Sequence, residues 1–215
     1  MELHANICPE YGYIDTASLI DLIKDIENND IWNHNDRHKN YVGAKNTQSI
    51  LFIWTPNLYS ENTFYVFSDT ILLNLPIGIE FQKIAKQVIK LIPGTIIKAA
   101  LVKLPPGYEI PFHRDGPHES WIKSHRLHLP VITEPEIFLT YSDCQYHLKK
   151  DTLTEINNQV KHGVIHNGKA DRYHLLFDIL PIDYNGEFSI IHHSDKELFD
   201  RHRIIEFNEQ RGYPD

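Results

Sequence analysis

Residues 95–115 read TIIKAALVKLPPGYEIPFHRD, and this stretch decides the fold. Its first part, Thr95–Leu104, is a long apolar run with β-branched side chains, which predicts a strand. Pro105-Pro106-Gly107 then predicts a tight turn, and Glu109–His113 predicts a second, short strand. The β-rich part of the chain therefore begins here.

Further strands and turns follow at short intervals. Asn157-Asn158 and Asn167-Gly168 are turn signals. The expected strands are Arg126–Ile132, Ile137–Tyr141, Gln145–Leu148 and Arg172–Leu180. Pieces of this length and spacing are typical of a double-stranded β-helix, the jelly-roll or cupin-like barrel. We therefore expect a mainly β fold with flanking helices.

Outside this core the sequence predicts mostly helices. Apolar residues at helical spacing from Leu19 to Ile26 predict a helix capped by Asp15-Thr16, and Pro76–Ile92 predicts another that Pro93-Gly94 ends. Ser49–Trp54 predicts a buried strand, and the residues from Ser194 onward predict a C-terminal helix.

Length and composition indicate one globular unit of 215 residues, of which 41% are hydrophobic and 23% charged. We expect a single domain, divided into a helix-containing part (1–94), the jelly-roll core that carries the metal site (95–181) and a C-terminal extension (182–215). The net charge of −8 disfavours nucleic acid and anionic membranes as partners. Two cysteines, no signal peptide and no membrane-length apolar run favour a reducing, cytoplasmic location.

Candidate metal ligands come from His-x-acid pairs, but this pattern alone is weak. About two such pairs are expected by chance in a chain this rich in histidine, and three occur: His34/Asp36, His113/Asp115 and His193/Asp195. Only the pair at 113 follows a predicted strand and turn and has both a distal histidine, His162, and an arginine-bearing strand after it. A lone histidine is more often just hydrogen-bonded, so the combination carries the prediction.

The chemistry of that combination is specific. Two imidazoles and one carboxylate leave one face of a metal open, which is the ligand set of non-haem Fe(II) oxygenases. Arg172 opens an apolar strand ten positions after His162, where a half-buried charge needs a partner. A dicarboxylate co-substrate is one candidate partner, and a surface ion pair is the alternative.

Four segments together resemble a known family. They are KLPPGYEIPFHRD (103–115), HRLHLPVI (125–132), TEINNQVKHGV (154–164) and RYHLLFDILP (172–181). This text resembles the aspartyl/asparaginyl beta-hydroxylase family of Fe(II)- and 2-oxoglutarate-dependent dioxygenases, over about eighty residues from Ala99 to Pro181. Departures are Thr154, where an aromatic residue is common, and the long insert Gly116–Ser124, which is either a substrate lid or a surface loop.

The resemblance implies roles for individual residues. His113, Asp115 and His162 would be the iron ligands, and Arg172 would bind the distal carboxylate of 2-oxoglutarate. His128 would contact the co-substrate, and Arg126 would contact co-substrate or substrate; we place these two on one strand face.

The expected function is an Fe(II)- and 2-oxoglutarate-dependent oxygenase that uses O2 to hydroxylate an amino acid, a peptidyl residue or a related small molecule. Two alternatives stay open at this point. One is a cupin-like metalloprotein that holds Zn or Mn with the same ligands. The other is a non-catalytic binding module on the same barrel.

Overall fold

The computed structural model describes residues 8–27, 30–33, 44–55, 59–60, 63–115 and 123–193. Some of the sequence predictions lie outside these residues. They are the pair His34/Asp36, most of the insert after Asp115, and the C-terminal helix expected from Ser194 onward. No helix in the described part of the chain has the length and apolar character needed to span a membrane.

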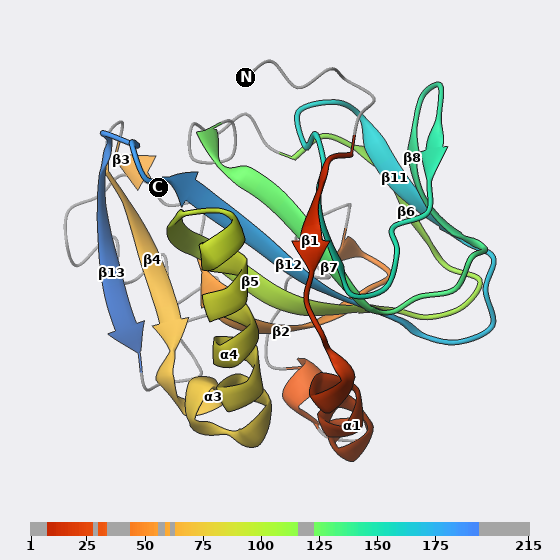
Figure 1. Cartoon of the computed structure of the whole chain (residues 1–215), viewed down its shortest axis with the longest axis horizontal. Helices are drawn as coiled ribbons and strands as arrows, with labels where there is room; N and C mark the ends of the chain where they lie inside the picture. Colours follow the sequence, from red (N-terminus) through yellow and green to blue (C-terminus); the bar gives the residue numbers. More distant parts are fainter. Residues whose placement is uncertain are drawn as a thin grey trace.

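Eight consecutive strands, β5 to β12, build the core of the fold (Figure 1). Their bounds are β5 Gly94–Leu104, β6 Glu109–His113, β7 His125–Ile132, β8 Ile137–Tyr141, β9 Gln145–Tyr146, β10 Thr152–Glu155, β11 His162–His166 and β12 Arg172–Pro181. β6 and β8 have the predicted ends. The strand predicted over Gln145–Leu148 stops earlier, because Leu148 packs into an apolar cluster with Leu139 and Ile156 instead of extending the pairing.

These eight strands are divided between two sheets: β5, β7, β10 and β12 belong to the larger sheet, and β6, β8, β9 and β11 belong to the smaller one. The larger sheet has the order β1-β10-β7-β12-β5-β2-β4-β13, and the smaller one has the order β6-β11-β8-β9. Every pair within β5 to β12 is antiparallel. Two facing antiparallel sheets that each take four of eight consecutive strands form a double-stranded β-helix. The predicted fold class, mainly β with flanking helices, is therefore confirmed.

The remaining strands extend the larger sheet at both edges. They are β1 Glu10–Tyr13, β2 Gln48–Trp54, β3 Tyr59–Ser60, β4 Thr63–Asp69 and β13 Glu187–His193. β2 includes the predicted strand Ser49–Trp54, whereas the sequence analysis missed the other four. β13 pairs parallel to β4, so strands from all three predicted parts of the chain share one sheet.

The helices cover the outer face of the larger sheet. Their bounds are α1 Ala17–Ile26, η1 Asp30–Asn33, α3 Thr70–Asn74 and α4 Pro76–Leu91. The cap of α1 differs in detail from the prediction. Asp15 accepts a hydrogen bond from the amide of Ala17 (2.9 Å). The Thr16 hydroxyl does not cap the helix and instead donates to the side chain of Asp151, which immediately precedes β10.

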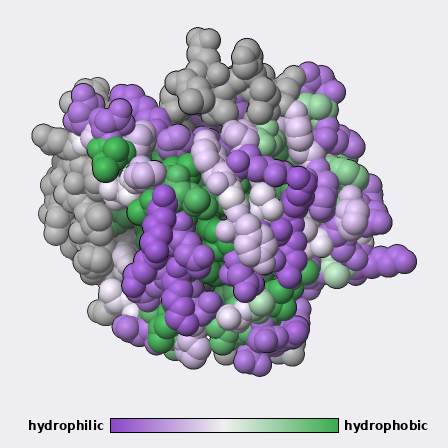
Figure 2. Space-filling view, viewed as in Figure 1, coloured by the Kyte–Doolittle hydropathy of each residue, from purple (hydrophilic) through white to green (hydrophobic). Residues whose placement is uncertain are grey.

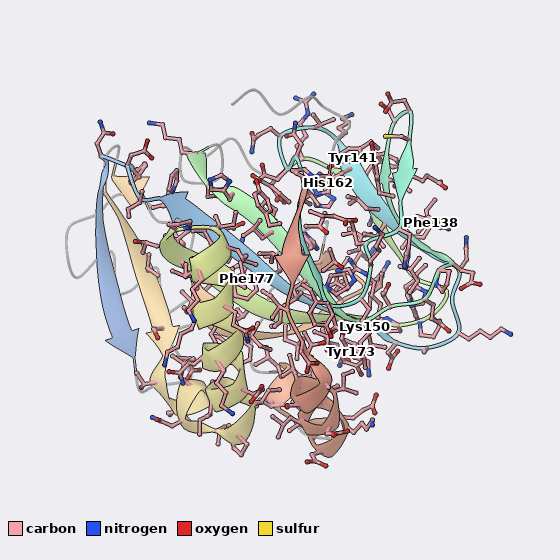
Figure 3. All side chains as sticks on the ribbon, in the orientation of Figure 1. Phe138, Tyr141, Lys150, His162, Tyr173 and Phe177 are labelled. Atoms are coloured by element: carbon pink, nitrogen blue, oxygen red, sulfur yellow. The ribbon has the colours of Figure 1, made fainter. Side chains whose placement is uncertain are left out.

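Aromatic side chains join the helices to this sheet. Phe81 of α4 stacks on Phe52 of β2 (ring centroids 4.2 Å apart) and on Phe177 of β12 (6.0 Å). Trp32 meets Tyr173 at 5.7 Å. Figure 3 places Phe177 beneath α4 and Tyr173 near α1, while Figure 2 shows hydrophilic side chains along the outward face of α4. The outer face of the sheet is thus a closed apolar core.

Alternation along β12 sends different chemistry to the opposite, inner face. Tyr173, Leu175 and Phe177 belong to the helix-side core, so the residues that alternate with them along β12 point toward the smaller sheet. These inner residues are Arg172, His174, Leu176 and Asp178, and all are buried. Three polar side chains on one buried strand face need partners inside the barrel.

Candidate metal centre

His113 and His162 lie opposite each other on β6 and β11 of the smaller sheet. The two residues are direct partners in the antiparallel register, and their ring centroids are 4.6 Å apart. Residues that are opposite in an antiparallel pair project to the same face. The pairing of β6 with β11 therefore brings the two predicted histidines together, although 48 residues separate them in the sequence.

The backbone fixes which nitrogen of each ring can bind a metal. Nδ1 of His113 lies 2.7 Å from the carbonyl oxygen of Pro111, and Nδ1 of His162 lies 2.9 Å from that of Val160. A carbonyl oxygen only accepts, so Nδ1 is the donor in both rings, and Nε2 is the nitrogen that offers its lone pair to a metal. A hydrogen bond of this kind orients metal-binding histidines in proteins.

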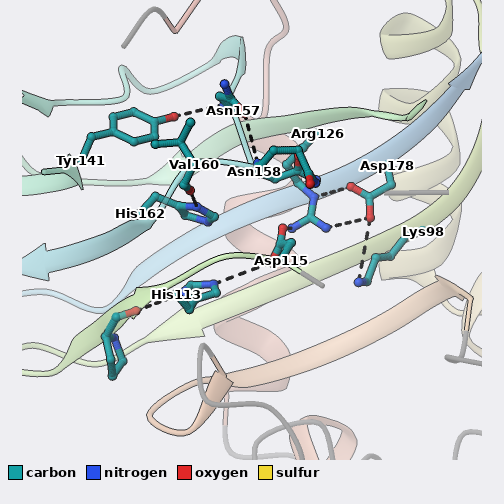
Figure 4. Close-up of polar contacts among 12 residues, drawn as sticks. Lys98, His113, Asp115, Arg126, Tyr141, Asn157, Asn158, Val160, His162 and Asp178 are labelled. Atoms are coloured by element: carbon teal, nitrogen blue, oxygen red, sulfur yellow. Dashed lines mark hydrogen bonds and ion pairs between the residues drawn. The ribbon is translucent and has the colours of Figure 1, made fainter. Parts of the chain in front are cut away.

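Asp115 completes the cluster from the end of β6. Its Oδ1 lies 3.7 Å from Nε2 of His113, and its amide donates to the carbonyl of Asn158 (3.1 Å). The candidate ligand atoms of His113, Asp115 and His162 all lie within 4.8 Å of one another. The three predicted ligands therefore converge, as Figure 4 shows.

The segment Asn157-Asn158 forms the turn that leads to His162. Asn157 Oδ1 accepts from the amide of Gln159 (3.0 Å), which is the expected Asx turn. The Asn157 amide donates to the Tyr141 hydroxyl (3.1 Å). Because Asn158 accepts from Asp115, this turn also anchors the carboxylate ligand.

Arg126 contacts the second oxygen of Asp115. Its Nη1 lies 2.5 Å from Asp115 Oδ2, in an ion pair rather than a hydrogen bond. Its other nitrogens face Asp178: Nε donates to Oδ1, and Nη2 donates to Oδ2 at 2.9 Å. Arg126 and His128 do share one strand face, and Arg126 is engaged by carboxylates of the protein itself.

Charge and burial favour the metal-binding forms of two candidate ligands, Asp115 and His162. Burial alone would raise the pKa of Asp115, but the nearby charges of Arg126 and Lys98 outweigh it and lower the pKa to about 2. Burial lowers the pKa of His162, which favours the neutral imidazole. A carboxylate and a neutral imidazole are the forms that bind metals.

Arg172 is buried, and within the described residues it has no carboxylate partner. Its Nη2 donates to Nδ1 of His174 (2.8 Å), while its Nε is buried without a hydrogen bond. Burial lowers the pKa of this guanidinium to about 9. The arrangement leaves a buried cation with unused donors, which is the property of an anion site.

His128 is within electrostatic range of both Arg172 and the candidate metal ligands His162 and Asp115. Burial, Arg172 and Arg126 lower its pKa well below the usual value, and His162 and Asp115 also contribute to its electrostatic surroundings. Neither ring nitrogen of His128 has a hydrogen-bond partner among the described residues. This neutral imidazole could serve a ligand that spans the metal and Arg172.

The sequence analysis missed three polar residues of this interior: His174, Asp178 and Lys98. Two of them stand alone in apolar runs, since Asp178 interrupts Leu175–Leu180 and Lys98 interrupts Ile96–Val102. Because a buried charge needs a partner, a lone charged residue in an apolar strand is the signal that indicates both positions.

The donor set fits a divalent metal of the iron type. It offers two imidazole nitrogens and one carboxylate oxygen on one side, which suits Fe(II) with open positions. No cysteine belongs to this cluster, so a thiolate site of the structural-zinc kind is not formed by these residues. Within the described residues, the interior can therefore hold a metal and, beside it, an anion.

The chain is similar in fold to several solved structures at low sequence identity. Among solved structures, a viral collagen prolyl hydroxylase from Paramecium bursaria Chlorella virus-1 is 11% identical (TM-score 0.48, covering 81% of this chain and 96% of that one). An oxidoreductase of the 2OG-Fe(II) oxygenase family from Burkholderia pseudomallei is 10% identical (TM-score 0.45, covering 66% of this chain and 68% of that one). A cupin domain from Bordetella pertussis is 20% identical (TM-score 0.32, covering 41% of this chain and 85% of that one).

No curated protein matches the sequence. The family model described as Aspartyl/Asparaginyl beta-hydroxylase matches residues 80–181, which run from within α4 through the whole of the eight-stranded core. All four segments quoted above lie within this range. The resemblance to the aspartyl/asparaginyl beta-hydroxylase family is thereby confirmed over residues 80–181.

Proposed function

We propose that this protein is an Fe(II)- and 2-oxoglutarate-dependent oxygenase that hydroxylates an amino acid, a peptidyl residue or a related small molecule. One observation carries the proposal. The cluster of His113, Asp115 and His162 shares its interior with Arg172, a buried cation that has no carboxylate partner among the described residues. The family match over residues 80–181 supports the same activity.

In this proposal His113, Asp115 and His162 hold Fe(II) through two Nε2 atoms and Oδ1. The bound metal with 2-oxoglutarate supplies the activation of O2, which couples decarboxylation of the co-substrate to hydroxylation of the substrate. The protein's own part is to orient both imidazoles through Pro111 and Val160 and to keep Asp115 ionised.

Arg172 binds the distal carboxylate of 2-oxoglutarate in the same proposal. A buried guanidinium without a counter-charge is costly, so a bound carboxylate stabilises it through two charge-assisted hydrogen bonds. His128 is neutral and has unused nitrogens, which suits a contact along the co-substrate. Arg172 and His128 therefore select a dianion that reaches from the anion site to the metal.

The proposed partners are O2 and a small-molecule or peptidyl amino-acid substrate. We also propose a cytoplasmic location. Its support is that Cys8 and Cys144 are free thiols, which persist in a reducing compartment.

The direct test is formation of succinate from 2-oxoglutarate with Fe(II), a reductant and air, in the presence of cell extract. The same extract is searched for products heavier by one oxygen atom. We expect both with the wild type and neither with His113→Ala. Lys24→Gln, a change on the exposed face of α1, is the control and should behave as the wild type.

Substituting Zn(II) or Mn(II) for Fe(II) separates the oxygenase from the alternative of a cupin-like Zn or Mn metalloprotein. An oxygenase loses succinate formation with Zn(II), whereas a hydrolytic or isomerising cupin would not need 2-oxoglutarate at all. If the wild type binds Fe(II) but not 2-oxoglutarate, the oxygenase proposal is wrong.

A further inference from the structure

Three charged residues form one row across the inner face of the larger sheet. Lys98 of β5, Asp178 of β12 and Arg126 of β7 are direct register partners on adjacent strands. Opposite residues in an antiparallel sheet have neighbouring side chains. Asp115, which follows β6 of the smaller sheet, continues the row by contacting Arg126.

The charges along this row alternate in sign. Lys98 Nζ lies 3.9 Å from Asp178 Oδ2 and also 4.1 Å from the centroid of the Trp54 ring. Asp178 is fully buried, and both of its oxygens accept from Arg126. A buried guanidinium paired to a carboxylate by two parallel bonds has a fixed orientation.

The orientation of Arg126 determines what its third nitrogen can reach. With Nε and Nη2 held by Asp178, Nη1 is directed to Oδ2 of Asp115. Oδ2 is thereby occupied, while Oδ1 remains on the side of His113. A carboxylate with one oxygen held in this way binds a metal through the other oxygen alone.

We propose that Arg126, held by Asp178, which Lys98 contacts in turn, is a positioning residue that makes Asp115 a one-oxygen metal ligand. This inference rests on the metal site of the proposed function. It differs from the role that the sequence resemblance implied for Arg126, which was contact with the co-substrate or substrate. In the structure all three guanidinium nitrogens face Asp115 and Asp178, so Arg172 is left to hold the co-substrate anion.

One-oxygen binding by Asp115 has a chemical purpose. A carboxylate that binds through both oxygens would take one more coordination position of the metal. The co-substrate and O2 of the proposed reaction would need the positions of the metal that the three protein ligands leave open. Arg126 thus protects the open face of the site.

The test measures binding of Co(II), a redox-stable substitute for Fe(II), to the full chain without co-substrate. We expect Asp178→Asn and Arg126→Gln each to weaken Co(II) binding by about tenfold or more, the loss usual when a residue that orients a ligand is changed. The visible spectrum of bound Co(II) should also weaken, because its absorption falls as the coordination number rises. Asp21→Asn, on the exposed face of α1, is the matched control and should change neither.

Asp178→Asn could fold poorly because Lys98 loses the carboxylate of Asp178, and a second variant addresses this case. Asp178→Asn combined with Lys98→Met restores the charge balance of the row. We expect its unfolding midpoint to exceed that of Asp178→Asn, while Co(II) binding stays about tenfold weaker than in the wild type. Recovery of wild-type Co(II) affinity and spectrum in the double variant would show a merely structural role and overturn the inference.

Affinity for 2-oxoglutarate, measured with Co(II) saturating, separates this role from direct co-substrate contact. We expect Arg126→Gln to leave it within about twofold, and Arg172→Gln to weaken it by about tenfold or more. A large loss in Arg126→Gln with unchanged Co(II) binding would overturn the inference. Failure to form succinate, with Co(II) binding still dependent on His113 and Asp178, would overturn the oxygenase proposal alone.

Discussion

Arg172 donates a hydrogen bond from Nη2 to Nδ1 of His174, 2.8 Å away and two residues further along the inner face of β12. A guanidinium has no lone pair to offer, so Nδ1 must accept and the ring proton lies on Nε2. Burial and the charge of Arg172 lower the pKa of His174 well below its usual value, so the ring is neutral. The remaining Nε2–H has no acceptor among the described residues.

The first prediction concerns this contact. His174→Leu removes the acceptor that orients Arg172, so we expect 2-oxoglutarate to bind about tenfold more weakly, as for the loss of a hydrogen bond to a charged group. His174→Asn keeps an acceptor near Nη2 and should lose less affinity. Titration of the metal-loaded protein with 2-oxoglutarate measures both.

The order of these two variants is the informative result. If His174→Asn binds 2-oxoglutarate no better than His174→Leu, then orientation of Arg172 is not the function of His174. Metal affinity serves as the control, because His174 contacts no member of the metal cluster in the hydrogen bonds of the described residues.

The second prediction is that acid destabilises the metal-free protein through its buried neutral histidines. Burial and neighbouring positive charge depress the folded-state pKa of His128 and His174. The unfolded chain takes up these protons below pH about 6.5. Stability is therefore full above that pH and falls as the pH drops toward the depressed folded values.

At pH 5.5 each such histidine should cost about 1.4 kcal/mol of unfolding free energy. Urea unfolding at pH 7.5 and 5.5 measures this loss, which should be smaller in His174→Leu. His125 is the opposite case, because its hydrogen bond to Glu155 raises its pKa, so His125→Gln should steepen the acid loss. Equal pH dependence in all three proteins would refute the assignment of protonation states.

The third prediction links metal binding to stability. We expect Co(II) to bind only the folded state, through His113, Asp115 and His162, so saturation at about 100 times Kd should raise the unfolding free energy by about 2.7 kcal/mol. A chelator should reverse the gain, and His113→Ala should show none. An equal gain in His113→Ala would place the Co(II) elsewhere.

The fourth prediction concerns Gly163, which follows the ligand His162. A Cβ at this position would lie 2.7 Å from the carbonyl oxygen of Ile110 and 3.3 Å from the amide nitrogen of Phe112, both in β6. Gly163→Ala must push β6 away from β11 and so separate His113 from His162. We expect a loss of about 1–3 kcal/mol in stability and about tenfold in Co(II) affinity.

Gly107 provides the contrast, because a Cβ there meets no atom within 4 Å although its φ of +76° is left-handed. Gly107→Ala should lose about 1 kcal/mol in stability and keep the Co(II) affinity of the wild type. Urea unfolding and Co(II) titration compare the two variants. Unchanged Co(II) binding in Gly163→Ala would show that the spacing of β6 and β11 does not control the site.

Much of the core could be predicted because it depends on local signals. The apolar run of β5, the turn Pro105-Pro106-Gly107 and the short strand of β6 follow one another in sequence, and the structure confirms them. The convergence of His113, Asp115 and His162 followed from motif spacing and the family resemblance. Strands β10 and β11 were missed because they have four and five residues of mixed polarity and form only through long-range pairing.

The row behind Asp115 could not be predicted from motif spacing. Lys98, Arg126 and Asp178 become neighbours only through the register of β5, β12 and β7. A shift of one residue in either pairing would turn one of these side chains to the helix-covered face. Cross-strand register, rather than composition, therefore determines what Arg126 contacts.

The alternation along β12 has a thermodynamic consequence for ligand binding. In the described part of the barrel interior, Lys98 and Arg126 pair with the carboxylates Asp115 and Asp178, and Arg172 adds one positive charge without a carboxylate partner. A divalent metal increases that positive charge, and a dianionic co-substrate removes the same amount. Each ligand should therefore raise the affinity of the other by an equal factor, because such coupling is reciprocal. The barrel would then favour being empty or filled with both ligands over holding either one alone.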